Sequence, residues 1–526
     1  MSRTALGLTL LVGALVVRTG RTPDPLPATA SPTEFSAERA LAHNRIIAER
    51  PHPTGSEQHA RVRAYIVAQL EALGLEPQLQ SATAVGTRYP VAGRVVNVLA
   101  RIPGRSPGGK AVLIAAHYDG VWAAPAAGDD GSSASALLET LRALRAGAPL
   151  DHDVIALFSD AEESGLLGAA TFVREHPWAR DAEVVLDFEA RGTEGRSVMF
   201  ETGAGNLDVV RVLRTVPDVT AGSLLVTVYR SMPNDTDLSE LALLGKPALN
   251  FAFVDGVERY HTAHDDIAHL SAGTLQHHGM QMLALARAFG NGPLPRPVTG
   301  DAIFFDAPLV GLVVYPESWA LPIALLVTLL VAAVVVRAVR REAKWGRGLS
   351  LGLVGMLVAT GVCGFMSLKI GAGLDALHAA RGWDGAPSWR GVYAAALAVL
   401  AIAVAAAIWA LVRRWAGALT LHAGALIAWT VLVILATLRV PGASYLFSIP
   451  VGAVALGVLT GGRGALAARW LATIVACAVL VPVTFTTGAY TLPLNGPGGI
   501  ATGALVSMIA WLLAPHLETM GGDRRW

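Results

Sequence analysis

Charged residues are scarce in this sequence. Only 15% of the 526 residues are Asp, Glu, Lys or Arg, whereas 53% are hydrophobic, and the mean hydropathy is +0.48. A purely water-soluble globular protein rarely reaches such values, so we expect part of the chain to lie in a membrane. The 41 basic and 40 acidic residues nearly cancel, which leaves no overall electrostatic field that would attract nucleic acid. We therefore expect no nucleic-acid partner.

Cysteine is almost absent as well. Cys363 and Cys477 are the only two, and both lie in apolar runs of the C-terminal half. The polar half of the chain contains no thiol, which excludes a disulfide framework and a cysteine-bound zinc site there.

The sequence divides into three segments. Residues 1–30 contain an apolar run from Ala5 to Val17, which we expect to be an uncleaved N-terminal signal anchor with its linker. Residues 31–297 alternate helical patterns with short apolar strands, as is typical of an α/β domain. Residues 298–526 are predicted to form an all-α polytopic membrane domain of about seven transmembrane helices. The apolar runs fall at about 319–336, 349–368, 392–412, 417–438, 443–460, 470–486 and 498–514.

Basic residues between these runs predict an orientation. If the first run enters from the side of the polar domain, the loops on the opposite side contain Arg337, Arg340, Arg341, Lys344, Arg347, Arg413, Arg414, Arg463, Arg469, Arg524 and Arg525. The loops on the side of the polar domain contain only Lys369, Arg381, Arg390 and Arg439. The positive-inside rule therefore places the polar domain outside the cytoplasm. The Ala- and Arg-rich composition favours a bacterial plasma membrane, although an endomembrane would satisfy the same topology.

The apolar runs themselves contain no Asp, Glu, Lys or Arg, and only His422 lies near the end of one. Ionisable residues would be expected along a transport pathway. The runs therefore favour anchoring, or confinement of a site near the bilayer, over transport.

Two short motifs in the polar domain place polar side chains after an apolar strand. In "AVLIAAHYDG", His117 stands at the carboxyl end of the predicted strand, and Asp119 can accept the second imidazole N–H. In "GDDGSS", Asp129 and Asp130 are adjacent carboxylates that repel each other unless a cation neutralises them. An Asx-rich surface turn is the alternative for this motif. A phosphate loop is excluded, because the side chains are acidic and no lysine follows the glycines.

Further carboxylates and a histidine follow at later strand ends. Glu162 and Glu163 follow "VIALFSDA", where one can bind a metal while the other holds a water as general base. Asp187 and Glu189 share one face of a strand, and only one of them is expected to reach the metal. His261 and His264 lie on the loop after "PALNFAF". Two histidines, three carboxylates and a free glutamate suit a pair of hydrolytic zinc ions.

Together, the motifs "PHPTGSEQHARVRAYIVAQLEALGLE", "AAHYDG", "GDDGSS", "DAEESGLLGA", "LDFEARG" and "YHTAHDD" resemble the M28 family of zinc metallopeptidases over residues 40 to 290. An N-terminal anchor, a peptidase domain and a polytopic C-terminal region are similar to the membrane-bound branch of that family. The resemblance implies a zinc-exopeptidase-like mixed sheet flanked by helices.

The resemblance also implies roles for particular residues. Asp129 would bridge two Zn²⁺ ions, with His117 and Glu189 on one ion and Glu163 and His261 on the other. Glu162 would be the general base, Asp119 would support His117, and the peptide between Asp129 and Asp130 would be cis.

One motif departs from the family pattern. The membrane branch reads Asn-Leu-Glu-Ala where this sequence reads "LDFEA", which aligns Glu189 with the ligand and leaves Asp187 in reserve. Asp235 and Asp237 resemble residues that line the family's pocket, although a helix N-cap explains Asp237 equally well. The other histidines of the domain, including His264 and His269, are expected to have no metal role.

These inferences lead to one functional expectation and its alternatives. We expect a membrane-anchored dinuclear zinc aminopeptidase that hydrolyses peptide bonds on the extracytoplasmic side. Its partners would be a peptide or protein substrate and the lipid bilayer, and the oligomeric state is left open. The alternatives are an inactive scaffold or binding protein of the same fold, and a glutaminyl-cyclase-like enzyme with a single zinc.

Overall fold

The computed structural model describes residues 20–106, 108–296, 300–307, 310–380, 390–460, 465–491 and 497–520. The apolar run of the predicted N-terminal anchor lies outside these residues. Contacts group the chain into one compact unit, Gly20–Glu317, and a second that contains the residues from Ser318 onward. The first unit, which we call the catalytic unit, ends at Glu317, and the domain boundary expected at residue 297 stays a prediction.

A mixed seven-stranded sheet forms the centre of the catalytic unit, with the order β1-β2-β4-β3-β5-β7-β6. The pairs among β4, β3, β5 and β7 are parallel, whereas β1, β2 and β6 join antiparallel at the two edges. The bounds are β1 Gln78–Val85, β2 Ala92–Ile102, β3 Ala111–His117, β4 Asp153–Ser159, β5 Ala182–Ala190, β6 Val198–Thr202 and β7 Ala248–Phe253. This sheet flanked by helices confirms the predicted α/β architecture.

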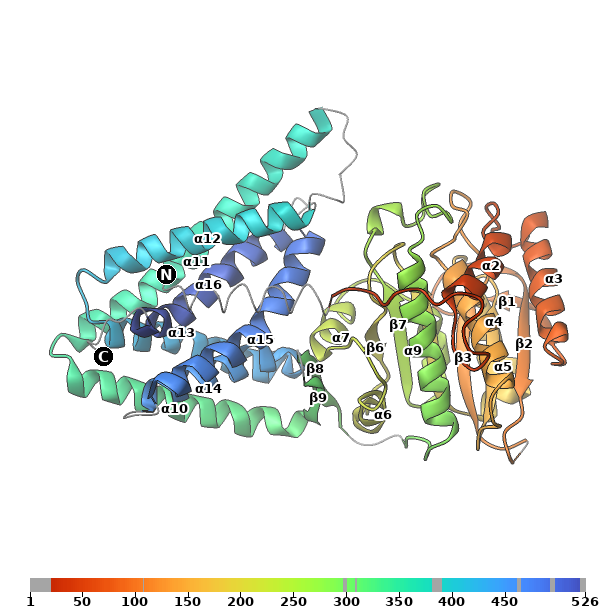
Figure 1. Cartoon of the computed structure of the whole chain (residues 1–526), viewed down its shortest axis with the longest axis horizontal. Coiled ribbons are helices and arrows are strands. Elements are labelled where there is room, and N and C mark those ends of the chain that lie inside the picture. The colour runs from red at the N-terminus through yellow and green to blue at the C-terminus, as the bar shows by residue number, and fades with distance from the viewer. Residues whose placement is uncertain are drawn as a thin grey trace. The chain divides into compact units, whose positions relative to one another are not determined.

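Both faces of the sheet are covered by helices (Figure 1). Along β3, Val112 and Ile114 pack into one apolar cluster, whereas Leu113 and Ala115 pack into another, because successive side chains of a strand point to opposite faces. The first cluster includes side chains of α2 Ala37–Ile47, α3 Glu57–Ala72, α4 Gly131–Arg145 and α9 Ala272–Gly290. The second includes side chains of α5 Leu167–Glu175 and α8 Asp237–Leu241. Burial on both faces explains the continuous apolar runs of β3 and β4.

Shorter elements complete the unit. They are η1 Pro177–Arg180, α6 Leu207–Leu213, α7 Ser223–Tyr229, η2 Ala242–Leu244 and η3 Val257–Arg259. A two-stranded antiparallel sheet, β8 Ala302–Ala307 with β9 Gly311–Pro316, lies at its carboxyl end. The hydroxyl of Ser223 donates to the carbonyl of Phe304 at 3.0 Å, which ties α7 to β8.

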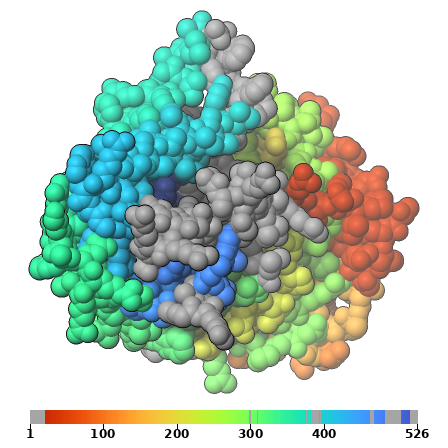
Figure 2. All heavy atoms as spheres, turned by 60° about the vertical axis from the view of Figure 1, so that its left-hand side comes forward, coloured from red at the N-terminus to blue at the C-terminus, as the bar shows by residue number. Residues whose placement is uncertain are grey.

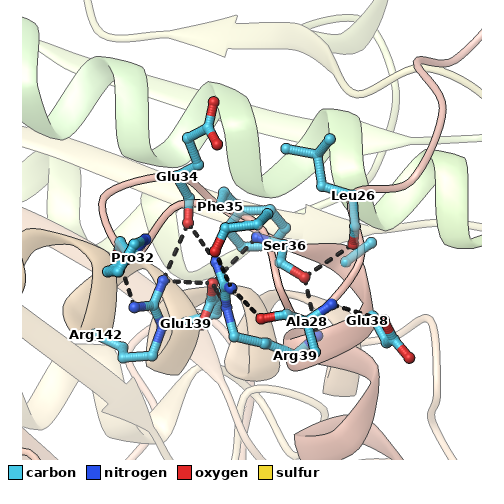
Figure 3. A network of polar contacts seen from close by, with 12 residues as sticks. Leu26, Ala28, Pro32, Glu34, Phe35, Ser36, Glu38, Arg39, Glu139 and Arg142 are labelled. Atoms are coloured by element: carbon cyan, nitrogen blue, oxygen red, sulfur yellow. Dashed lines mark hydrogen bonds and ion pairs between the residues drawn. The ribbon is translucent and has the colours of Figure 1, made fainter.

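Residues 21–36, here called the N-terminal strap, are held on the unit by a buried charge (Figure 3). Glu139 of α4 is fully buried and pairs with Arg39 at 2.8 Å and with Arg142 at 2.6 Å. Both guanidinium groups also donate to backbone carbonyls of the strap, among them those of Ala28 and Pro32. Because every charge here has a partner, the burial of Glu139 is tolerated.

The second unit, here called the helical unit, is built from apolar helices. They are α10 Ala320–Arg341, α11 Trp345–Ala380, α12 Arg390–Val412, α13 Ala418–Arg439, α14 Tyr445–Leu459, α15 Ala465–Thr491 and α16 Pro497–Met520, with η4 Glu317–Trp319 before α10 and η6 Pro441–Ala443 before α14.

Within the described residues, four segments are long and apolar enough to cross a membrane: Glu317–Arg341, Trp345–Leu374, Ala395–Val412 and Ala418–Arg439. Three shorter apolar helices coincide with the last three predicted runs: Tyr445–Leu459, Leu466–Leu480 and Gly503–Ala514. The expected total of about seven spans stays a prediction.

The helices of the helical unit, coloured from green to blue in Figure 2, expose many large hydrophobic side chains. Its exposed large side chains include Leu325 and Leu329 on α10, Leu357 on α11 and Val399 on α12. An apolar surface of this kind is costly in water and suits contact with lipid. These helices are therefore candidate membrane spans.

Candidate metal centre

Most of the predicted site residues meet at one edge of the sheet. His117 ends β3, Glu162 and Glu163 follow β4, and Glu189 lies near the end of β5. These strands run parallel, so their carboxyl ends share an edge, where ligand sites of open α/β sheets form. His261 reaches the same place from the loop after β7.

Asp129 lies between the two histidines. Its Oδ1 is 3.3 Å from Nε2 of His117, and its Oδ2 is 3.1 Å from Nε2 of His261. A glutamate accompanies each histidine, Glu189 at 3.6 Å from His117 and Glu163 at 3.0 Å from His261. The donor atoms form two groups, His117 with Asp130 and Glu189, and Asp129 with Glu163 and His261, each with its atoms within 4.8 Å of one another. Two adjacent cations could therefore be held, with Asp129 facing both.

Asp130 belongs to the first group, although the sequence had indicated no separate role for it. The peptide between Asp129 and Asp130 is cis, which confirms that expectation. Oδ2 of Asp130 accepts the backbone N–H of His117 at 3.2 Å, while its Oδ1 is buried and accepts no hydrogen bond within the described structure. Asp130 therefore offers one buried oxygen to the site.

Asp119 connects His117 to Glu162. Nδ1 of His117 lies 3.0 Å from the backbone oxygen of Asp119 and 3.4 Å from its carboxylate. The same carboxylate accepts the backbone N–H of Glu162 at 3.0 Å and the hydroxyl of Thr54 at 3.1 Å. Burial alone would raise the pKa of Asp119, but its contacts with His117 outweigh burial and lower it. Asp119 thus fixes the imidazole with Nε2 directed at the centre.

Asp265 is a positioning residue that sequence reasoning overlooked. Its carboxylate accepts the backbone N–H of Gly128 at 2.6 Å and that of Asp129 at 3.1 Å. Asp265 lies in the motif "YHTAHDD", but the motif does not show which backbone groups its carboxylate reaches. His261 itself has a left-handed backbone with a φ of 59°, a conformation that non-glycine residues adopt mainly where surrounding structure enforces it.

The site contains several carboxylates and few positively charged groups. Burial, followed by the nearby Asp129, raises the pKa of Glu163 to about 7. Burial, followed by Glu189, raises the pKa of Glu162 well above its usual range. Burial alone would lower the pKa of His261, but the nearby carboxylates of Asp129 and Glu163 outweigh it and raise the pKa to about 9. Divalent cations would relieve this repulsion.

One detail of Glu163 fits a shared cation. Its Oε1 lies 3.0 Å from Nε2 of His261, yet this buried oxygen has no hydrogen bond of acceptable geometry. Two ligand atoms that lie close without hydrogen bonding are placed as ligands of one ion would be. Oδ1 of Asp130 is also buried without a hydrogen bond. Both oxygens are therefore available to a cation, and the donor set is compatible with zinc.

The remaining acidic candidates point elsewhere. Asp187 accepts the backbone N–H of Leu238 at 2.9 Å and belongs to neither donor group. Asp237 accepts the hydroxyl of Ser159. Asp235 pairs with Arg88 at 3.0 Å and accepts the Tyr89 hydroxyl at 2.8 Å.

A third group of possible metal ligands contains His264, Asp266 and His269. These residues lie on the loop that carries His261, and Nδ1 of His269 is 2.8 Å from Asp266. His264 is exposed and the other two are half-buried. The expectation that His264 and His269 have no metal role therefore stays a prediction.

Comparisons with known proteins show which family this domain resembles. Residues 97–286 match the model of peptidase family M28. The chain is 31% identical over 230 residues to the putative endoplasmic reticulum metallopeptidase 1-A of Caenorhabditis elegans, covering 42% of this chain and 26% of the relative. It is 29% identical over 241 residues to the vacuolar membrane protease of Candida dubliniensis, covering 44% and 26%. The chain thus spans about a quarter of the length of these curated relatives.

Among solved structures, an aminopeptidase from Aneurinibacillus sp. strain AM-1 is 14% identical with a TM-score of 0.41, covering 51% of this chain and 98% of that one. The family match includes the strands and loops that bring His117, Asp129, Glu163 and Glu189 together, and His261 falls within the same range. This chain therefore carries a metallopeptidase domain of peptidase family M28.

Proposed function

We propose that the chain is a membrane-anchored dinuclear zinc peptidase that acts as an aminopeptidase. The observation that carries the proposal is the position of Asp129, whose two carboxylate oxygens each face the Nε2 atom of a different histidine. His117 and Glu189 would complete one zinc site, and Glu163 and His261 the other. Two bound zinc ions would supply a water of lowered pKa and polarise the scissile carbonyl.

The side chains around the ions have separate tasks. Glu162 lies outside both donor groups, 3.9 Å from Nε2 of His117, and we assign it the general base that accepts the proton of the attacking water and passes it to the leaving amine. Asp119 holds the imidazole of His117 and the backbone of Glu162. Asp265 holds the backbone of Asp129.

An excess of acidic groups favours an amine-bearing substrate. Besides the donor groups, Asp187, Asp237 and Glu201 are buried or half-buried near Glu189, and burial raises the pKa of each. A protonated α-amine would bring the positive charge that these carboxylates lack. A peptide with a free N-terminus meets this requirement.

The decisive test of the proposal combines metal content with hydrolysis. Full-length protein purified in detergent should bind two zinc ions per chain and cleave peptides with free N-termini. Cleavage should cease with a chelator and return with zinc, and N-acetylated peptides should resist it. One zinc per chain would favour cyclisation of N-terminal glutamine, and two bound ions without any hydrolysis would favour the scaffold alternative.

We further propose that the catalytic unit faces the extracytoplasmic side of a bacterial plasma membrane, as the basic loops of the helical unit support. The catalytic unit has no cysteine of its own, because Cys363 and Cys477 both lie in the helical unit. In a chain with both replaced by alanine, an impermeant maleimide should label Glu57→Cys on intact cells. It should not label Arg341→Cys until the cells are opened. The reverse pattern would contradict the orientation.

A further inference from the structure

Arg191 is a cationic group beside the metal centre that the proposed mechanism does not use. It follows Glu189 by two residues, and its backbone N–H donates to the carbonyl of Phe253 at 2.9 Å. Its guanidinium carbon lies 5.2 Å from the centre of the Tyr260 ring. That ring stacks on His261, with the centroids 3.7 Å apart and the planes 17° apart. Arg191 and a metal-site histidine therefore contact the same aromatic ring.

The guanidinium has no acidic partner among the residues that the structure describes. Its polar side-chain contact is neutral, an N–H donated to Oδ1 of Asn234 at 3.3 Å. Asp235, which follows Asn234 in the chain, pairs with Arg88 instead. An arginine that is half-buried without a counter-charge has donors available for an anion.

Asn234 supplies a second available donor at the same place. Because its Oδ1 accepts from Arg191, the amide presents Nδ2 as its donor, and this atom is buried without a partner in the described structure. Leaving a buried donor unpaired is unfavourable, because the group has lost its water without gaining a partner. A planar anion that bridges the guanidinium and this amide would satisfy both groups, and a carboxylate has that shape.

We propose that Arg191 and Asn234 form a subsite for a carboxylate of the substrate, so that the preferred substrates are dipeptides and tripeptides with a free C-terminus. An extended peptide advances about 3.3–3.6 Å per residue. The two ring distances therefore place the guanidinium within about two or three residues of His261. The terminal carboxylate of a short peptide bound by its amine at the metals would fall in this range. This inference rests on the proposed peptidase function.

The same chemistry could recognise an acidic side chain, and a substrate panel separates the two sources. Zinc-loaded full-length protein is assayed for kcat/KM on Leu-Ala, on its C-terminal amide Leu-Ala-NH₂, and on Leu-Asp-NH₂. We expect kcat/KM for Leu-Ala to exceed that for Leu-Ala-NH₂ by about 10- to 100-fold, because the free carboxylate would accept charge-assisted hydrogen bonds that the amide cannot accept. A preference for Leu-Asp-NH₂ equal to that for Leu-Ala would contradict recognition of the C-terminus.

Variants distinguish a subsite from a packing role beneath Tyr260. Arg191→Met should bring the acid-to-amide ratio in kcat/KM close to one, Arg191→Lys should restore part of it, and Asn234→Ala should reduce it several-fold. Arg61→Met is the control, because that guanidinium lies in an exposed pair with Glu57 on α3, and its ratio should equal that of the wild type. Equal wild-type rates on acid and amide would overturn the subsite, as would a variant at Arg191 that slows both substrates alike. Absence of hydrolysis of every peptide by wild type with zinc bound would instead contradict the peptidase function itself.

Discussion

Replacing Glu162 by glutamine isolates the proton-transfer step from metal binding. The carboxylate of Glu162 is 12% exposed and belongs to neither donor group. Its backbone N–H, which donates to Asp119, is unaffected by the substitution. Glutamine has the same shape but cannot accept a proton from water. We therefore expect Glu162→Gln to fold, to bind both ions and to lose turnover.

The size of the loss follows from the task assigned to this carboxylate. A positioned general base contributes about 10²- to 10⁴-fold, which corresponds to about 3–5 kcal/mol in the activation barrier. Because burial and Glu189 already raise the pKa of Glu162, removal of its charge should also relieve repulsion in the metal-free protein. The variant should therefore be at least as stable as the wild type when no metal is bound.

The assay measures kcat on a short peptide together with zinc content by elemental analysis. Glu163→Gln is the matched control, because the neighbouring carboxylate lies 3.0 Å from His261 in the second donor group. That variant should lose metal and turnover together. The reasoning is refuted if Glu162→Gln keeps more than about a tenth of the wild-type kcat, or if it loses zinc as Glu163→Gln does.

Three further predictions concern positioning and stability. Asp119→Asn should weaken zinc affinity about 10- to 100-fold in a chelator competition, and unchanged affinity would contradict its role behind His117. Burial lowers the pKa of His278 to about 3, so only the unfolded state gains this proton below pH 6.5, and stability falls as pH drops from 6.5 toward 3. At pH 5 this lowers the free energy of unfolding by about 2 kcal/mol. The melting temperature of His278→Gln should therefore fall less than that of the wild type between pH 7.5 and pH 5, and equal decreases would refute the assignment. Arg39→Met leaves the buried Glu139 without one of its partners and should cost about 3–5 kcal/mol in thermal unfolding, whereas Arg61→Met, in an exposed pair, should cost little.

The sequence predicted the strand ends well because burial on both faces leaves a clear signal. Apolar runs predicted the strands that end at His117, before Glu162 and near Glu189. The structure shows that these strands are parallel, so that the three residues share one edge. Which side chains pair across different elements was harder to predict from the sequence. Asp187 and Glu189 have the same strand parity, and only the position of α8 shows that Asp187 is engaged by the N–H of Leu238.

Contacts between distant loops left no sequence pattern at all. Asp265 supports Asp129 across more than a hundred residues, and Arg191 meets Asn234 from a separate loop. The burial of Glu139 was equally hidden, because a lone glutamate in a helix normally indicates a solvent-exposed position. In each case the partner is supplied by tertiary structure, whereas periodicity reports only which face of an element is apolar.

The N-terminal strap determines when the catalytic unit can be completed during synthesis. The side chain of Gln276 on α9 accepts the N–H of Leu26, 250 residues earlier, and donates to the carbonyl of Phe35 at 3.0 Å. Gly279 lies against the ring of Phe35, where even a methyl group would overlap it. At about 5–20 residues per second, the strap waits some tens of seconds after it is made before α9 exists to receive it. A chain released before α9 is made would leave Phe35 uncovered. Incomplete chains would therefore expose an apolar side chain that chaperones and proteases can recognise.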